Sequence, residues 1–262
     1  MGALINDLVT RISEVIDRDS LRIKSISKGF RFTCTVLANE SCGMCYSIFN
    51  QDPIDSCKYI NSKKSMKDLD IRKLLQFVKN VDDDLERVIG ISTLNAVSQH
   101  ILWKNVKKYR IKYDTDPLDH LKVEETDRVV MIGNIRGFLP RLQKTVQDVV
   151  VIDDGLKNMS LPYLKSPETS QEHLNRADVV FITGSAIANR TLEKLIQWSE
   201  NAREITVVGP TAGFVAEPLF ARGVTILSSM QVLEPAKVLK NIVEGGGTPN
   251  FKVYCRKYNI FR

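Results

Sequence analysis

The sequence predicts an α/β protein in which a small α+β domain is followed by a larger α/β domain with a parallel sheet. Two observations predict this class. The chain has 262 residues, of which 43% are hydrophobic and 26% charged, which is typical of globular proteins and long enough for two domains. The hydrophobic pattern also changes along the chain, from a short alternating region to apolar runs that recur at regular intervals.

The first domain is expected to contain a helix, three strands and two further helices. Apolar residues recur at helical spacing over residues 3–18, which predicts an amphipathic helix. Residues 22–49 divide into three stretches separated by turn signals, which predicts an antiparallel meander. Helical spacing returns over residues 67–79 and 84–108. We therefore place the first domain at residues 1–113.

The second domain is expected to follow a linker. The polar segment 114–127 contains Pro117 and several acidic residues, as linkers often do. Within residues 128–262, apolar runs alternate with helical or loop segments, which is typical of buried parallel strands. An alternating stretch from Phe251 to Tyr258 predicts a last strand at the edge of the sheet. The other predicted strands are 128–132, 148–152, 178–182, 204–208 and 224–227.

Charge and cysteine content limit the classes of partner. The 37 basic and 31 acidic residues give a net charge of +6, spread over both halves, which suits a small anionic ligand better than nucleic acid. The first residues contain no apolar signal segment, and no later run reaches 18 apolar residues, so we expect a cytoplasmic protein without a membrane partner. The five cysteines disfavour a disulfide framework. A homodimer would be compatible with this composition.

Ligands of open parallel sheets bind beyond the carboxyl ends of the strands. After the first predicted strand comes the turn Gly133 to Gly137, and Asp153 follows 20 residues after Gly133, a spacing that suits a ribose-binding acid. The turn has only two of the glycines of the dinucleotide fingerprint. A tight structural turn with a solvated acid therefore remains the main alternative to a nucleotide site.

Hydroxyl and glycine residues follow the next two predicted strands. They could present hydroxyl and backbone donors to an anion, and Asn189 could cap a helix that begins near Arg190. A structural turn explains the same residues equally well, because the two loops meet only if their strands are adjacent. The candidate residues are Thr183, Gly184, Ser185, Asn189 and Thr191 in one loop, and Gly209, Pro210 and Thr211 in the other.

Two further features are candidates for chemistry. Cys42 and Cys45 have the spacing of a thiolate pair that could share a soft metal ion, but no second pair follows, and Cys34 and Cys57 are only possible partners. In a regular strand they would point to opposite faces, which favours free thiols. Asn95 is a polar residue within a mostly apolar helix, so we expect it in a buried hydrogen-bond network or at a cleft between the domains.

Four segments resemble a prokaryotic family described as putative heavy-metal chelation proteins. They are RVIGISTLNAV, TGSAIANRTLE, VVGPTAGFVAEPLFARGVTIL and EPAKVLKNIVEGGGT. The resemblance implies an enolase N-terminal-like domain joined to a Rossmann-like domain, with a site in the cleft between them. It also implies a heavy or transition metal ion, or a small metal-chelating metabolite, as the ligand. An enzyme that uses a nucleotide-type cofactor at the Rossmann-like strand ends is the alternative hypothesis.

Overall fold

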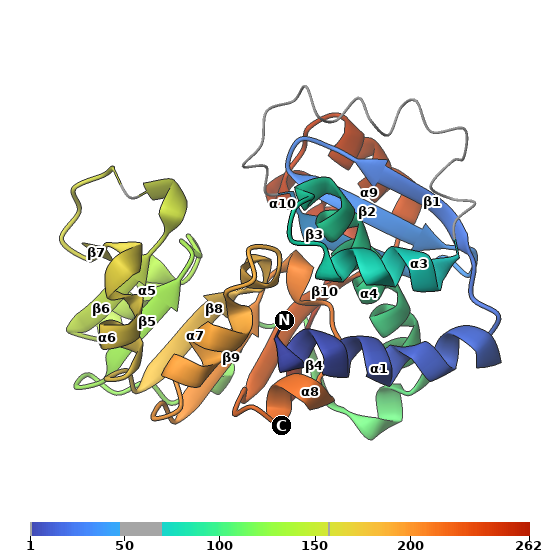
Figure 1. Ribbon diagram of the computed structural model, residues 1–262. Coiled ribbons are helices and arrows are strands. Elements are labelled where there is room, and N and C mark those ends of the chain that lie inside the picture. Colours follow the sequence, from blue (N-terminus) through green and yellow to red (C-terminus); the bar gives the residue numbers. More distant parts are fainter. Residues whose placement is uncertain (1, 48–69, 157) are drawn as a thin grey trace.

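The computed structural model describes residues 2–47, 70–156 and 158–262, and it confirms the predicted α/β class. Within these residues there are two sheets, one antiparallel with three strands and one mostly parallel with eight. Figure 1 shows the small sheet beside one end of the large sheet, with helices around both. None of the helices in the described ranges is both long enough and apolar enough to cross a bilayer.

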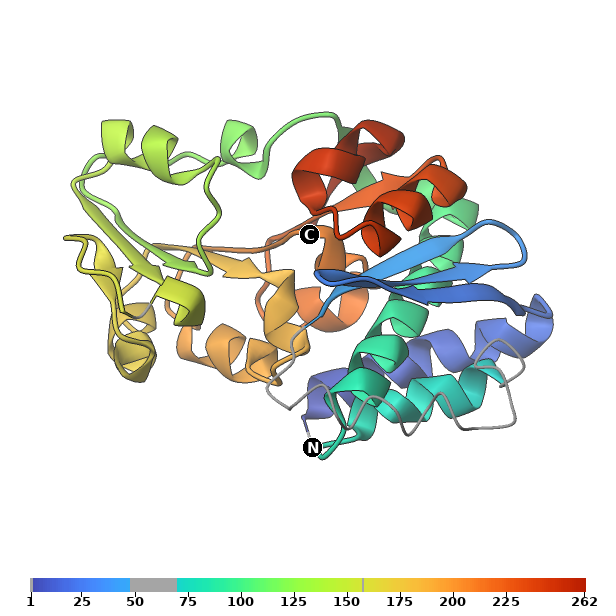
Figure 2. The same ribbon diagram turned by 90° about the horizontal axis from the view of Figure 1, so that it is seen from above.

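The small sheet confirms the predicted meander as far as the described residues extend. Its strands, in sheet order, are β1 (Ile23–Lys28), β2 (Phe32–Leu37) and β3 (Cys42–Tyr46). Every residue of β2 is buried, because helices cover both faces of the sheet. In Figure 2 the blue strands lie between the teal helix α4 (Asp84–Lys104) and the red helices α9 (Pro235–Val243) and α10 (Thr248–Phe251).

Three helices of the first part form one packed group around this sheet. Helix α1 (Ala3–Arg18) buries the apolar stripe that predicted it. Helix α3 (Ile71–Gln76) continues as the 3-10 turn η3 (Phe77–Lys79), and the predicted start of this helix before residue 70 lies outside the described residues. Most of α4 is buried on all sides, because it packs against the small sheet, η3 and α1 at once. The predicted helix 84–108 ends in the 3-10 turn η4 (Val106–Lys108).

The large sheet has the order β4-β11-β10-β9-β8-β5-β6-β7. The six strands from β10 to β7 are parallel, whereas β11 is antiparallel to both of its neighbours, β10 and β4. The strands are β4 (Arg110–Tyr113), β5 (Arg128–Ile132), β6 (Asp148–Ile152), β7 (Leu164–Lys165), β8 (Val179–Thr183), β9 (Glu204–Val208), β10 (Ile226–Val232) and β11 (Cys255–Phe261).

Alternate residues of the parallel strands pack into two different cores. Val129 and Met131 contact the layer that contains α5 (Leu139–Thr145), whereas Val130 belongs to the larger core on the opposite face. The remaining helices are α6 (Ser170–Leu174), α7 (Leu192–Trp198) and α8 (Glu217–Phe220). The 3-10 turns of this part are η5 (Pro117–His120), η6 (Asp154–Leu156), η7 (Pro167–Thr169), η8 (Gly184–Ile187), η9 (Pro210–Ala212) and η10 (Lys252–Tyr254).

The last strand differs from the prediction. We expected an edge strand from Phe251 to Tyr258, but β11 begins at Cys255 and lies between β10 and β4. Strand β4 was not predicted from the sequence. This short strand occupies the outer position, where its Tyr113 pairs with Tyr258. An interior position explains why Tyr258 and Ile260 are fully buried.

The predicted division into residues 1–113, 114–127 and 128–262 stays a prediction. Elements on each side of the linker pack with elements on the other side. Strand β4 precedes the linker but extends the large sheet, and α9 follows it but covers the small sheet. The two sheets therefore share a continuous packed boundary, and the strand-end loops lie next to it.

Candidate functional site

The loops after β5, β8 and β9 meet at one edge of the large sheet. The three strands are parallel neighbours, so their carboxyl ends lie side by side. A Cβ atom built on Gly133 would lie 2.8 Å from Cγ2 of Thr183. One built on Gly184 would lie 2.6 Å from the backbone nitrogen of Ala212, in η9. The structure thus brings the two predicted polar loops together, with Thr183 next to the Gly133 turn.

Two hydroxyls and two glycine turns occupy this edge. The Oγ atoms of Thr183 and Ser185 are 3.0 Å apart, and both side chains are partly exposed. Gly133 and Gly209 have backbone φ angles of +87° and +121°, which residues with a side chain rarely adopt. No described residue places an atom within 4 Å of the Cβ position of Gly209. Space is therefore open beside the Gly209 Cα atom, whereas its N–H donates to the backbone oxygen of Ser228 and its carbonyl accepts from the Ser229 hydroxyl.

Asn189 shapes its loop rather than capping a helix. We expected a helix start near Arg190, but α7 begins at Leu192, and the side chain of its N-cap residue Thr191 accepts no capping hydrogen bond from the helix. The Thr191 hydroxyl donates to Oδ1 of Asn189 at 2.6 Å, and the backbone N–H of Thr191 donates to the same atom at 3.3 Å. Arg190, with a φ of +65°, makes the turn that allows this local bond.

Asn95 joins the small sheet to the strand-end loops. Its Nδ2 donates to the backbone oxygen of Met44 in β3 at 2.7 Å and to that of Thr211 in η9 at 2.8 Å. The Thr211 hydroxyl in turn accepts from the backbone N–H of Tyr46 at 2.9 Å. Asn95 and Thr211 are both buried, so these bonds are shielded from water. The predicted buried network is present, and it fixes η9 against β3.

Arg87, which our sequence reasoning missed, supports the other loop. Its Nε donates to the backbone oxygen of Ala188 at 2.6 Å, and its guanidinium forms an ion pair with Asp84 one helical turn earlier. The side chain is almost fully buried. The single charged residue in the helix segment RVIGISTLNAV was the available signal, because a buried charge needs partners.

Asp153 lies at the end of β6, where it binds backbone groups of two turns. Its Oδ2 accepts from the backbone N–H of Asn134 at 2.6 Å, and its Oδ1 accepts from that of Gly155 at 2.8 Å. Both carboxylate oxygens therefore already have donors, as the structural alternative requires. The ribose-binding role stays a prediction, and no observed contact favours it.

We expect Asp153→Ala to lower the free energy of unfolding by about 1–2 kcal/mol, because two backbone N–H groups lose their acceptor. The measurement is urea denaturation. Asp154→Ala, at the exposed neighbouring position, is the control and should change stability by less than about 0.5 kcal/mol. Equal effects of the two substitutions would show that the Asp153 carboxylate does not hold the turn.

Cys42 and Cys45 do not converge on one metal ion. Cys45 packs into the core under α4, whereas Cys42 packs on the opposite face, under α9. Burial raises the pKa of the Cys45 thiol far above its usual range. A contact with Cys34 and burial raise the pKa of Cys42 as well. Among the described residues, no three His, Cys, Asp or Glu side chains come close enough to share a metal ion.

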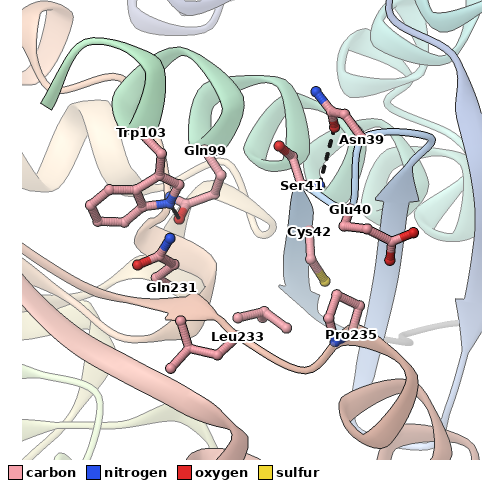
Figure 3. Close-up of a pocket in the computed structure, with 10 residues that line it drawn as sticks. Asn39, Glu40, Ser41, Cys42, Gln99, Trp103, Gln231, Leu233 and Pro235 are labelled. Carbon is pink, nitrogen blue, oxygen red and sulfur yellow. Dashed lines mark hydrogen bonds between the residues drawn. The ribbon is translucent and has the colours of Figure 1, made fainter.

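A separate cavity of about 300 Å³ opens between the small sheet, α4 and the end of β10 (Figure 3). Gln99 and Trp103 extend from α4 towards Gln231 on the other side. The Gln99 side chain is held in place, since its Nε2 donates to Tyr258 and to the backbone oxygen of Gly213, and its Oε1 accepts from Trp103. The lining residues are Asn39, Glu40, Ser41, Cys42, Gln99, Trp103, Gln231, Val232, Leu233 and Pro235.

Comparison with known families identifies the fold and the family. Two family models match the chain, over residues 12–98 and 116–261, and both are described as "Putative heavy-metal chelation". The second match, to the DUF364 model, covers more than half of the chain. The chain belongs to this family. The description of this family concerns chelation of heavy metals. The resemblance expected from the sequence is confirmed.

Relatives of this family share the fold over nearly the whole chain. A protein of unknown function from Pyrococcus horikoshii superposes with a TM-score of 0.80 at 20% identity, covering 99% of this chain and 100% of that one. A second, from Desulfitobacterium hafniense DCB-2, gives 0.75 at 18% identity, with 98% and 99% covered. An uncharacterized protein of Methanocaldococcus jannaschii is 25% identical over 201 residues, 74% of either chain. The two solved structures support the fold.

Proposed function

We propose that the chain binds a small anionic, metal-chelating metabolite at the strand-end loops, in the cleft between its two predicted domains. The observation that carries this proposal is the meeting of the loops after β5, β8 and β9, with the Thr183 and Ser185 hydroxyls between the Gly133 and Gly209 turns. Asn95 attaches one of these loops to the small sheet, so the proposed site borders both sheets.

The chemistry of the loops suits an anion. Hydroxyls and backbone N–H groups donate hydrogen bonds to carboxylate or phosphate oxygens. Two exposed cations, Arg136 and Arg190, belong to the same loops. The acid of this region, Asp153, is held by the backbone N–H groups of Asn134 and Gly155, which offset part of its negative charge. A net charge of +6 favours the same class of ligand.

The same residues do not fit a bare heavy-metal ion. Soft cations prefer thiolate and imidazole ligands, whereas the loops offer neutral hydroxyl and amide groups. The described residues also provide no cluster of three metal-ligating side chains. In the proposed complex the metal therefore arrives already held by the metabolite, and the protein contacts the chelator.

The test is a thermal-shift measurement with citrate and pyrophosphate, each with and without Fe(III). A ligand at 100 times its dissociation constant stabilises the folded state by about 2.7 kcal/mol, which raises Tm by several degrees. We expect such a shift with the parent chain and its loss in the double variant Thr183→Val with Ser185→Ala, because the bonded pair of hydroxyls, which has one proton left for a ligand, is removed.

Thr145→Val is the matched control. Thr145 is exposed at the end of α5, away from the carboxyl edge of the sheet, so its removal should leave the shift unchanged. The proposal is wrong if none of the four probe solutions raises Tm, or if the double variant responds as strongly as Thr145→Val does. NAD, NADP, S-adenosylmethionine and ATP in the same assay test the cofactor alternative, for which we expect no shift.

A further inference from the structure

Sulfur atoms gather in the layer between the small sheet and α9. This layer contains Cys34, Cys42 and Met44 from the sheet and Met230 from β10, and Cys255 packs against it. The layer thus contains three of the four cysteines in the described residues. Its other members are apolar side chains such as Val238, Ile242 and Phe251. The result is a sulfur-rich, mostly apolar environment without carboxylates among the described residues of this cluster.

Cys34 and Cys42 form a pair within this layer. They lie on neighbouring strands, where Cys34 faces Met44 and Cys42 faces Val36, so the two thiols are diagonal neighbours on one face. Their Sγ atoms are 3.0 Å apart, and both side chains are buried. The strand register alone therefore places two thiols together without any loop rearrangement.

We propose that Cys34 and Cys42 form a two-thiolate site for a soft divalent cation of the Hg(II) type. Binding replaces two S–H protons by two metal–sulfur bonds, so that one cation enters and two protons leave. The product is neutral, and it places no net charge in the apolar layer. A monovalent soft ion would leave one negative charge there, which is costly, and Zn(II) takes four ligands in closed sites.

The surroundings provide room and access for the ion. Two metal–thiolate bonds of about 2.3 Å span at most about 4.6 Å, so a rotation of one side chain about its Cα–Cβ bond opens the pair sufficiently. Cys42 lines the cavity of about 300 Å³ and points towards Pro235 in Figure 3. Met44 and Met230 are flexible neighbours that can repack around the ion, and their thioethers are soft ligands themselves.

The test is retention of Hg(II) against a competing monothiol. The full chain, carrying Cys57→Ser to remove the thiol outside the described residues, receives one equivalent of HgCl₂ and then excess glutathione. Native mass spectrometry should show one mercury per chain, with a mass gain of one mercury less two protons. We expect Cys34→Ala and Cys42→Ala each to weaken retention by at least about 100-fold, because a lone thiol has no advantage over glutathione.

Two variants are the controls. Cys45→Ala removes an equally buried thiol from the opposite face of the small sheet, and Cys255→Ala removes the thiol that packs against the Cys34–Cys42 layer. Both variants should retain mercury as the parent does. Retention that survives Cys34→Ala or Cys42→Ala, or that is lost in Cys255→Ala, overturns the proposal.

If an alanine variant fails to fold, X-ray absorption of the mercury-loaded parent decides the question. Two sulfur neighbours of the mercury are expected, and nitrogen or oxygen neighbours contradict the proposal. The Thr183→Val with Ser185→Ala variant should retain mercury, which separates this site from the strand-end loops.

Discussion

Gly43→Ala is expected to lower the free energy of unfolding by at least about 3 kcal/mol. A Cβ atom at this position would lie 2.1 Å from the backbone nitrogen of Ala96 and 2.3 Å from the backbone oxygen of Ser92. Overpacking of a core costs about 1–3 kcal/mol when side chains can adjust, and more when they cannot. Here the obstacle is the backbone of α4, so the helix and the sheet would have to separate. Urea denaturation followed by circular dichroism measures the loss.

Gly137→Ala is the control for this substitution. No described residue has an atom within 4 Å of the Cβ position of Gly137. The change should therefore alter the free energy of unfolding by less than about 0.5 kcal/mol. A comparably small loss in Gly43→Ala would contradict the close contact of β3 with α4 that positions the strand-end loops.

Asn95→Ala is expected to cost roughly 2–6 kcal/mol. The substitution leaves the backbone oxygens of Met44 and Thr211 without their donor, and each unpaired buried acceptor costs about 1–3 kcal/mol. Asn95→Asp should be at least as damaging, because it keeps the size but brings a carboxylate against two carbonyl oxygens. The measurement is the same urea denaturation, together with the thermal shift induced by the probe anions.

The control for Asn95 is Asn201→Ala. The side chain of Asn201 also donates to a backbone oxygen, that of Asn175, but at an exposed position where water can replace it. We expect a change below about 0.5 kcal/mol. If Asn95→Ala were no more destabilising than Asn201→Ala, the buried bonds between α4, β3 and η9 would not hold the two sheets together.

The sequence predicted most of the fold because its signals are local. The helical stripe of residues 3–18 and the apolar run of residues 128–132 each determine one element, and both elements are confirmed. The position of β11 could not be predicted in this way. It depends on pairing with β4, more than 140 residues earlier in the chain, and no local pattern carries that information.

The candidate site was predictable in position but not in detail. Polar residues at strand ends indicated the loops at Gly133, Thr183 and Gly209, and the adjacency of their strands brings these loops together. The residues around Asp153 in the sequence did not show that both of its carboxylate oxygens accept hydrogen bonds from backbone N–H groups. Cys34 was only a possible partner of the Cys42 and Cys45 pair, because its contact with Cys42 depends on the register of β2 against β3.

The most direct test of the proposed function is native mass spectrometry combined with elemental analysis, on protein purified without a metal-affinity tag or chelator. We predict one metal and one small organic anion per chain, lost together in the Thr183→Val with Ser185→Ala variant and retained in Thr145→Val. An organic anion and metal that both stay bound in the double variant would contradict chelate binding at the strand-end loops, whereas metal alone that is lost in Cys34→Ala would belong to the thiol pair.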